Sequence, residues 1–359
     1  MLNWITTRAV DRLRAAWKDD IRRQSDPLRG DLTHLVEAVK SLEANVTHSM
    51  ETLHARLNEM VERQAAVEHR AELLRHIVLR NEKHHDRLAQ LPVLLNSSRV
   101  LAHVRDAIER APLEHDPFPH AVVENLLPAD VYEEVVRAIP PKVFFGGEPR
   151  KQNLRLPVDE APALTCRVWR FVEDVIARDA IVPAVIDKFR QPLRAHYATI
   201  FGPALSDRAE AMPQAPSGGR IMLRRAGYRL APHRDPKRSM VTCLMYLATK
   251  ADQEQYGTEI YRVSGDRESS YMQTYYPEQH GARCELVKVV PFRANSMLVF
   301  VNSGGAHGAR IPDDAPPELE RYSYQFYVGP GLDDLASLIA DLPPDRQAMW
   351  RERKQDAER

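Results

Sequence analysis

The feature that most constrains the fold is the segment 31–91, which contains neither proline nor glycine. Apolar residues recur in it at alternating steps of three and four, the spacing of a helix that presents one seam to a partner helix. The seam positions are Leu32, Leu35, Val39, Leu42, Val46, Met50, Leu53, Leu57, Met60, Gln64, Val67, Ala71, Leu74 and Val78. The pattern predicts a long α-helical coiled coil over residues 31–91, and it favours self-association.

Two details leave the partner of this helix open. Two successive steps of four, from Leu42 through Val46 to Met50, resemble a stutter that locally relaxes a supercoil. Gln64 and Ala71 weaken the seam, so neither strand number nor orientation follows from the sequence. The alternative to an oligomer is a single long helix that folds back onto the rest of the chain.

Residues 1–30 are expected to form an amphipathic helix, because apolar side chains are interspersed with arginines there. The apolar members are Trp4, Ile5, Val10, Leu13 and Trp17. Such a helix either packs on protein or, through residues 1–24, contacts a membrane surface. It lacks the continuous apolar stretch of a signal peptide, and no segment approaches the roughly 18 apolar residues needed to span a bilayer.

Composition excludes several functional classes. Lys+Arg and Asp+Glu both number 50, which argues against a chain-wide electrostatic footprint for nucleic acid, so no nucleic-acid partner is expected. The cysteines, Cys166, Cys243 and Cys284, are odd in number and have no CxxC spacing. Disulfides and a thiolate zinc site are therefore not expected, and a cytoplasmic location fits best.

The chain changes character near Pro92. Residues 92–116 are expected to form a helical linker, 117–330 a globular domain, and 331–359 a helical tail. Short β-type runs dominate the globular part, at 120–123, 220–223, 240–247, 259–263, 286–290, 297–301 and 322–328. Helical patterns lie between them at 128–139, 163–179 and 184–200. These elements predict a mainly β sandwich or barrel with helices on one side.

One constellation in the globular part points to chemistry. His233 and Asp235 are two residues apart, so on an extended backbone both side chains leave the same face. His307 follows the apolar run MLVFV further along the chain. Two histidines and one carboxylate form the facial triad of non-haem Fe(II) oxygenases, which leaves coordination positions open for a co-substrate and O₂. We therefore predict that His233, Asp235 and His307 are metal ligands and catalytic residues.

A co-substrate with a distal carboxylate needs a cation. Arg321 is the best candidate, because a guanidinium group matches a carboxylate in bidentate fashion. Ser323, two residues on and on the same strand face, can add a hydroxyl donor. Tyr246, on the strand after the His233 turn, can offer a phenol to the same group. Arg310 is the competing cation, but we expect it in a loop.

Residues 117–330 resemble the 2-oxoglutarate/Fe(II)-dependent dioxygenases, especially their bacterial prolyl-hydroxylase-like branch. The opening DPFPHAVVENLLPADVYEEVVRAIP, the HRD and AHG motifs of the ligands, and the RYS motif that begins at Arg321 carry this resemblance. The resemblance implies a double-stranded β-helix, or jelly roll, with the metal at its mouth. It also implies Fe(II), 2-oxoglutarate and O₂ as cofactor and co-substrates, with ascorbate as a reductant, and hydroxylation with release of succinate and CO₂.

One departure from the family pattern concerns spacing. The interval from His307 to Arg321 is longer than is usual in the family, and the turn-like insert PDDAPPEL within it is expected to lengthen a loop. The substrate is not specified, and a protein, a glycan or a small metabolite would each be compatible. Arg220 and Arg224, before the HxD turn, either contact an anionic substrate or face solvent.

Two alternative functions remain. The chain can be a metal-binding but catalytically silent scaffold that acts through its coiled coil. It can also be a cupin-like metalloenzyme that does not use 2-oxoglutarate. Each residue taken singly also has a structural explanation, since Asp235 begins an ordinary turn and Arg321 has Glu320 as a neighbouring ion-pair partner.

Overall fold

The computed structural model describes residues 2–249, 254–266, 268 and 270–351, and for residues 2–9 it describes the backbone alone. The predicted positions of the Trp4 and Ile5 side chains and the end of the tail, 352–359, therefore lie outside the described residues. Packing divides the chain into two compact units, Met1–Ala71 and Glu72–Arg359. Among the described residues, no helix is both long enough and apolar enough to cross a membrane.

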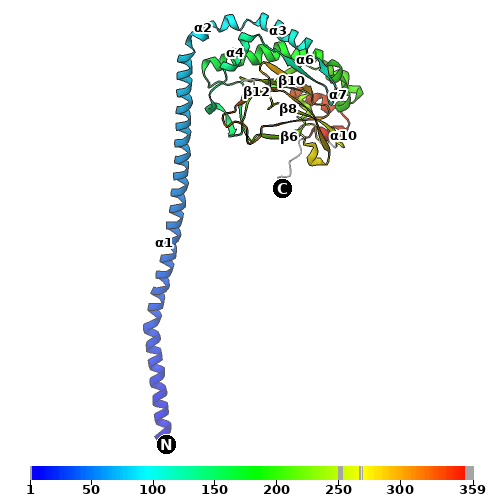
Figure 1. Cartoon of the computed structure of the whole chain (residues 1–359). Helices are drawn as coiled ribbons and strands as arrows, with labels where there is room; N and C mark the ends of the chain where they lie inside the picture. The colour runs from blue at the N-terminus through cyan, green and yellow to red at the C-terminus, as the bar shows by residue number, and fades with distance from the viewer. Residues whose placement is uncertain (1, 250–253, 267, 269, 352–359) are drawn as a thin grey trace. The chain divides into compact units, whose positions relative to one another are not determined.

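The first unit is helical. Helix α1 runs from Leu2 to Lys83 without a break at Pro27, and Figure 1 shows it as one continuous ribbon. Apolar seam side chains stand exposed along it, for example Leu42 at 66% and Met60 at 67%. Exposure of so many aliphatic groups along one helix is typical of a surface that a partner covers.

The second unit contains twelve described strands and a set of helices. The strands are β1 (Leu113–Glu114), β2 (His120–Glu124), β3 (Gly146–Glu148), β4 (Lys151–Arg155), β5 (Gln214–Arg224), β6 (Arg229–His233), β7 (Val241–Tyr246), β8 (Thr258–Ser264), β9 (Arg283–Val290), β10 (Ser296–Val301), β11 (Ala306–Arg310) and β12 (Arg321–Pro330). The helices are α2 (His85–Leu94), α3 (Ser97–Arg110), α4 (Ala129–Arg137), α5 (Ala163–Phe171), the π-helix η2 (Val172–Ile181), α6 (Val182–Lys188), α7 (Arg190–Phe201), α8 (Pro203–Ala211), α9 (Leu332–Ala340) and α10 (Pro344–Gln347).

The strand order defines a jelly roll. Strands β5 to β12 divide between two antiparallel sheets, in the order β10-β7-β12-β5 within the larger sheet and β6-β11-β8-β9 in the smaller one. Two facing sheets formed from eight strands in this order are the double-stranded β-helix. On the larger sheet, β2 and β1 extend one edge and β4 and β3 extend the other. The predicted fold class, a jelly roll preceded by a long helix, is confirmed.

Alternating residues of the large sheet face two different cores. On β7, Val241, Cys243 and Met245 pack with the helices, whereas Leu244 and Tyr246 lie in the core between the sheets. This alternation follows from the period of two along a strand. Figure 1 shows α3, α4, α6 and α7 gathered on one side of the strands, which confirms the expected helical layer. The opposite face of the large sheet is left to line the interior of the barrel.

The segment predicted as a linker contributes to this core. Helix α3 begins after Asn96, whose side chain accepts a hydrogen bond from the backbone N–H of Arg99 at 3.0 Å, a normal N-cap. Its buried residues, Val100, Val104 and Ile108, recur every four positions and pack into the helical core. Residues 97–110 are thus part of the folded unit. Pro92 lies inside α2 instead of ending a helix.

Candidate metal centre and co-substrate pocket

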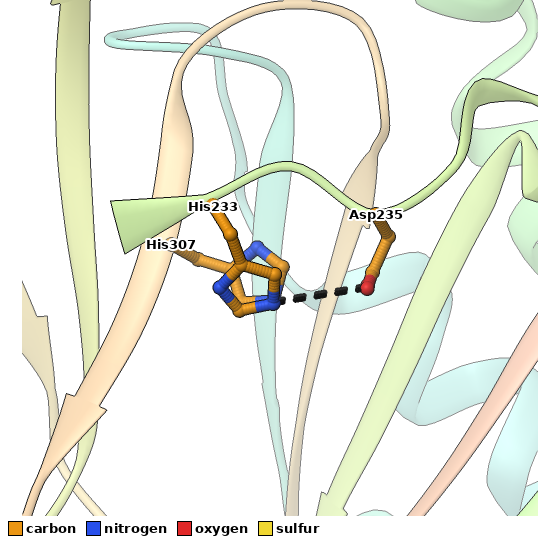
Figure 2. Close-up of side chains that lie close together, drawn as sticks. All are labelled: His233, Asp235 and His307. Carbon is orange, nitrogen blue, oxygen red and sulfur yellow. Dashed lines mark ion pairs between the residues drawn. The ribbon is translucent and has the colours of Figure 1, made fainter. Parts of the chain in front are cut away.

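The three predicted ligands come together at one end of the small sheet. His233 is the last residue of β6, and it pairs directly with His307 of β11 in the antiparallel register. Asp235 follows two residues after His233, so the extended backbone turns its side chain to the same side. Figure 2 shows the two imidazole rings overlapping in projection, with the Asp235 carboxylate beside them.

The distances suit a single metal ion. The Asp235 carboxylate lies 3.8 Å from Nε2 of His233 and 3.7 Å from Nε2 of His307. One ligand atom from each residue lies within 4.8 Å of the other two. Ligand atoms bound at about 2.1 Å to one ion stand about 3 to 4 Å apart, so small adjustments bring these three onto a common ion. All three residues are buried, which excludes solvent from that side of the site.

Burial keeps the imidazoles neutral, the form that binds metal. It lowers the pKa of His307 to about 3, with the neighbouring His233 adding to the effect. Burial also lowers the pKa of His233. The carbonyl of Ala231 lies 3.0 Å from Nδ1 of His233, so this nitrogen donates a hydrogen bond and Nε2 keeps its lone pair toward the ion.

The carboxylate ligand is oriented by two hydroxyl groups. The Thr242 hydroxyl donates to Oδ2 of Asp235 at 2.8 Å, and the Tyr327 hydroxyl donates to Oδ1 at 3.4 Å. Asn302 in turn donates to Thr242 at 3.1 Å. Hydrogen bonds of this kind fix the rotamer of a metal ligand, and their partners contribute to metal affinity.

A buried cation lies in the same cavity. Arg321, the first residue of β12, is 3% exposed, and its guanidinium carbon lies 4.3 Å from the Phe292 ring centre. Its Nε and Nη2, and the hydroxyl of fully buried Ser323, have no hydrogen-bond partner among the described residues. Burial lowers the pKa of Arg321 to about 10, which still leaves it charged at neutral pH. Buried donors without partners indicate a missing acceptor, and an anion satisfies them.

Tyr246 ends strand β7, on the strand after the His233 turn as predicted, and its role toward the co-substrate stays a prediction. Its hydroxyl donates to Thr258 at 2.8 Å, and its ring lies 5.7 Å from the guanidinium carbon of Arg321. Thr258 lines the cavity, whereas Tyr246 is fully buried behind it. Arg310 is exposed and ends strand β11 instead of lying in the expected loop. The structure therefore brings Arg321, and not Arg310, to the cavity.

The cavity that holds these groups has a volume of about 840 Å³, within the range of small-molecule sites. The three predicted ligands and Arg321 all line it. Tyr276, from the segment between β8 and β9, also lines it and stacks on His233 with ring centres 5.7 Å apart. The site therefore combines three candidate metal ligands and a buried arginine with unpartnered donors in a cavity of small-molecule size.

Sequence reasoning missed several lining residues. Gln325 and Tyr327 continue the two-residue period that begins at Arg321 and Ser323, so this strand pattern contained their signal. Lys151 and Arg155 also line the cavity. They belong to the short strand β4, whose sequence KQNLR shows no clear alternation of polar and apolar residues.

Arg234, between His233 and Asp235 in the sequence, connects the segments that carry the candidate metal ligands. Its guanidinium pairs with Asp266 at 2.7 Å and Glu268 at 2.6 Å. It also donates to the carbonyl of Gly305 at 3.1 Å, two residues before His307. One buried side chain thus connects the segment that carries His233 and Asp235 with the segment that carries His307.

We expect Arg234→Met to destabilise the second unit by about 3 kcal/mol, because Asp266 loses its buried cation and Glu268 keeps only Lys237 as a partner. The affinity for metal should fall as well, because the segment that carries His307 loses the hydrogen bond from Arg234 to the Gly305 carbonyl. Thermal denaturation and Mn(II) titration measure the two effects. The matched control is Arg229→Met, which replaces an exposed arginine of β6, the strand that ends one residue before Arg234. If Arg234→Met and Arg229→Met had the same thermal stability and the same Mn(II) affinity, Arg234 would not organise the site.

Comparisons with known proteins find similarity among solved structures. Neither a known family profile nor a curated protein matches the sequence. Among solved structures, a 2OG-Fe(II) oxygenase family oxidoreductase from Burkholderia pseudomallei is similar at 9% identity, with 58% of this chain and 84% of that chain covered and a TM-score of 0.36.

Two further structures belong to the same comparison. HygX from Streptomyces hygroscopicus, solved with nickel, 2-oxoglutarate and hygromycin B, is 15% identical over 59% of this chain and 83% of its own, with a TM-score of 0.36. A prolyl-4-hydroxylase from Pseudomonas putida is 15% identical over 64% of this chain and 99% of its own, with a TM-score of 0.34. The jelly roll itself is defined by the strand order of this chain.

Proposed function

We propose that the chain is an Fe(II)- and 2-oxoglutarate-dependent oxygenase that hydroxylates its substrate. The observation that carries this proposal is the pairing, in one cavity, of two neutral histidines and a carboxylate with a buried arginine whose donors lack partners. A metal ion alone would account for the two histidines and the carboxylate. A metal-chelating co-substrate with a distal carboxylate accounts for these three residues and for the buried arginine together.

Different residues of the cavity would bind the metal and the co-substrate. His233, Asp235 and His307 would hold the metal on one face, and three coordination positions remain open. Arg321 and Ser323 would bind the distal carboxylate of 2-oxoglutarate and so fix the orientation of its keto acid end. Fe(II) bound there, together with 2-oxoglutarate and O₂, supplies the oxidising power for hydroxylation. The hydroxyl groups of Thr242 and Tyr327 keep the Asp235 carboxylate in place throughout.

The direct test is succinate formation from 2-oxoglutarate, measured with Fe(II), ascorbate and O₂. We expect succinate release that stops when Fe(II) is chelated or O₂ is removed. A chain that binds both ligands without forming succinate would favour the silent scaffold. A metal-dependent activity that ignores 2-oxoglutarate would favour the cupin-like alternative.

We also propose that helix α1 mediates self-association. The exposed seam residues on α1 support this, because aliphatic side chains exposed at coiled-coil spacing are stabilised when a second helix covers them. A cytoplasmic location and a membrane contact of residues 1–24 stay predictions.

Analytical ultracentrifugation tests the self-association. We expect the wild type to sediment above its monomer mass of 41.0 kDa. Replacing both Leu53 and Leu57 with glutamate should shift it to the monomer, because the charges oppose burial of the seam. Ala55→Glu, between them but off the seam, is the control. A wild type that sediments at the monomer mass would contradict the proposal.

A further inference from the structure

The cavity has an excess of positive charge that the proposed chemistry does not use. Six basic residues line it, and Asp235 is the one carboxylate among the lining residues that the structure describes. The six are Lys151, Arg155, Arg220, Arg224, Arg238 and Arg321. A metal dication balances Asp235 and adds further positive charge, and the distal carboxylate of 2-oxoglutarate balances Arg321. Several cations therefore still lack a counter-charge.

The strand register places five of these cations in two rows across the large sheet, and the sixth, Arg238, lies outside the strands. Lys151 on β4 pairs with Arg224 on β5, and Arg224 pairs with Arg321 on β12. In the second row Arg155 pairs with Arg220, and Arg220 pairs with Gln325. The five cations and Gln325 stand at alternate positions of their strands, so they share the face that lines the cavity.

Directly opposed like charges destabilise a sheet. Arg155 and Arg220 are such a pair, and their Cβ atoms are expected to lie about 5 Å apart. No ion pair to a carboxylate involves either residue in the described part of the chain. Arg220 is held instead by neutral groups, the Gln325 side chain and the Tyr327 hydroxyl, the latter at 3.1 Å. An anion between the two guanidinium groups would convert this repulsion into binding.

The second row is next to the metal centre and separate from the co-substrate position. Tyr327, which accepts a hydrogen bond from Arg220, donates one to the ligand Asp235 at 3.4 Å. The two rows are four residues apart along each strand, which spans about 13 Å, so an anion at Arg155 and Arg220 does not overlap a carboxylate at Arg321. A substrate anchored in this row would extend from its anchor toward the open side of the metal.

We propose that the substrate is a small organic phosphate, bound through its phosphate by Arg155 and Arg220. This inference rests on the proposed function, because it names the substrate class of that site. Two guanidinium forks match the tetrahedral oxygens of phosphate, and a dianion balances two cations. Lys151, exposed at the rim, adds to the attraction. The cavity of about 840 Å³ accommodates a small molecule of this kind.

Calorimetric titration of the full-length chain, loaded with Mn(II) and 2-oxoglutarate, tests the proposal with phenyl phosphate as probe. We expect phenyl phosphate to bind, and benzoate to bind at least about tenfold more weakly, because a monoanion balances one cation and not two. Arg220→Gln and Arg155→Gln should each weaken phenyl phosphate about tenfold, the effect of removing one charged hydrogen-bonding partner. Arg262→Gln, an exposed arginine on β8, is the matched control and should leave affinity unchanged.

Three results would overturn the proposal: equal affinity in all variants, equal binding of benzoate, or displacement of phenyl phosphate by 2-oxoglutarate, which would place the phosphate at Arg321. Arg155 is exposed, so its variant tests the site even where Arg220→Gln folds poorly. If Mn(II) and 2-oxoglutarate do not load while the chain alone binds phenyl phosphate with the predicted pattern, the oxygenase assignment fails and the phosphate site stands.

Discussion

Replacing His233 with alanine is expected to weaken Fe(II) binding by more than about 100-fold and to abolish succinate formation. Loss of a partner hydrogen-bonded to a ligand already lowers metal affinity by about 10- to 100-fold, and loss of a ligand has a larger effect. Here the site has three protein ligands, and one missing imidazole leaves a two-ligand site with weak affinity. Equilibrium dialysis with Mn(II) or anaerobic Fe(II) gives the affinity directly.

The control for this variant is His103→Ala. His103 is half-buried on α3 and contacts the backbone carbonyl of Asn125, so its loss removes a histidine without touching the cavity. Thermal denaturation of both variants separates a folding defect from a loss of ligation. Metal affinity that stays within a few-fold of wild type in His233→Ala would mean that the ion, if any, binds elsewhere.

The second large effect is expected from Arg321→Met. The affinity for 2-oxoglutarate should fall by about 30- to 1,000-fold, because a buried charged pair of this type contributes about 2–4 kcal/mol to binding. Metal affinity in the absence of 2-oxoglutarate should stay at the wild-type level. Among the described residues, Arg321 makes no hydrogen bond to His233, Asp235 or His307. Titration of 2-oxoglutarate into the Mn(II)-loaded chain measures the change.

Methionine is chosen because it fills the site beside Phe292 without a charge. The ligand-free variant should be at least as stable as the wild type, because it no longer buries a cation whose donors lack partners. Arg310→Met, the exposed competitor on β11, should bind 2-oxoglutarate normally. Normal 2-oxoglutarate affinity in Arg321→Met, together with weakened affinity in Arg310→Met, would contradict the assignment of the co-substrate carboxylate to Arg321.

Local spacing explains why the metal residues could be predicted from the sequence. His233 and Asp235 share a face whenever the backbone is extended, whatever the rest of the fold does. Arg321 and Ser323 follow the same rule on β12. The pairing of His307 with His233 is a long-range contact that local spacing does not specify, so the sequence suggested His307 from its residue type and its place after an apolar run.

The basic rows were beyond sequence reasoning for a physical reason. Arg155 and Arg220 are far apart in the chain, and their opposition depends on the pairing of β4 with β5. Strand β4 has a polar, half-exposed sequence, so no hydrophobic period marks it. The sequence therefore left open whether Arg220 contacts an anion or solvent. The helix α3 was likewise predicted as a helix, but its place in the core depends on packing that a local pattern does not specify.

An anaerobic titration of Fe(II) and 2-oxoglutarate, followed through the visible metal-to-ligand charge-transfer band, tests whether 2-oxoglutarate chelates a metal held by His233. We expect a band in the green region for the wild-type chain and no band for His233→Ala. For Arg321→Met we expect a band that develops at higher 2-oxoglutarate concentration. Iron that binds to the wild type without any band on addition of 2-oxoglutarate would contradict the co-substrate assignment and leave a metal site of another chemistry.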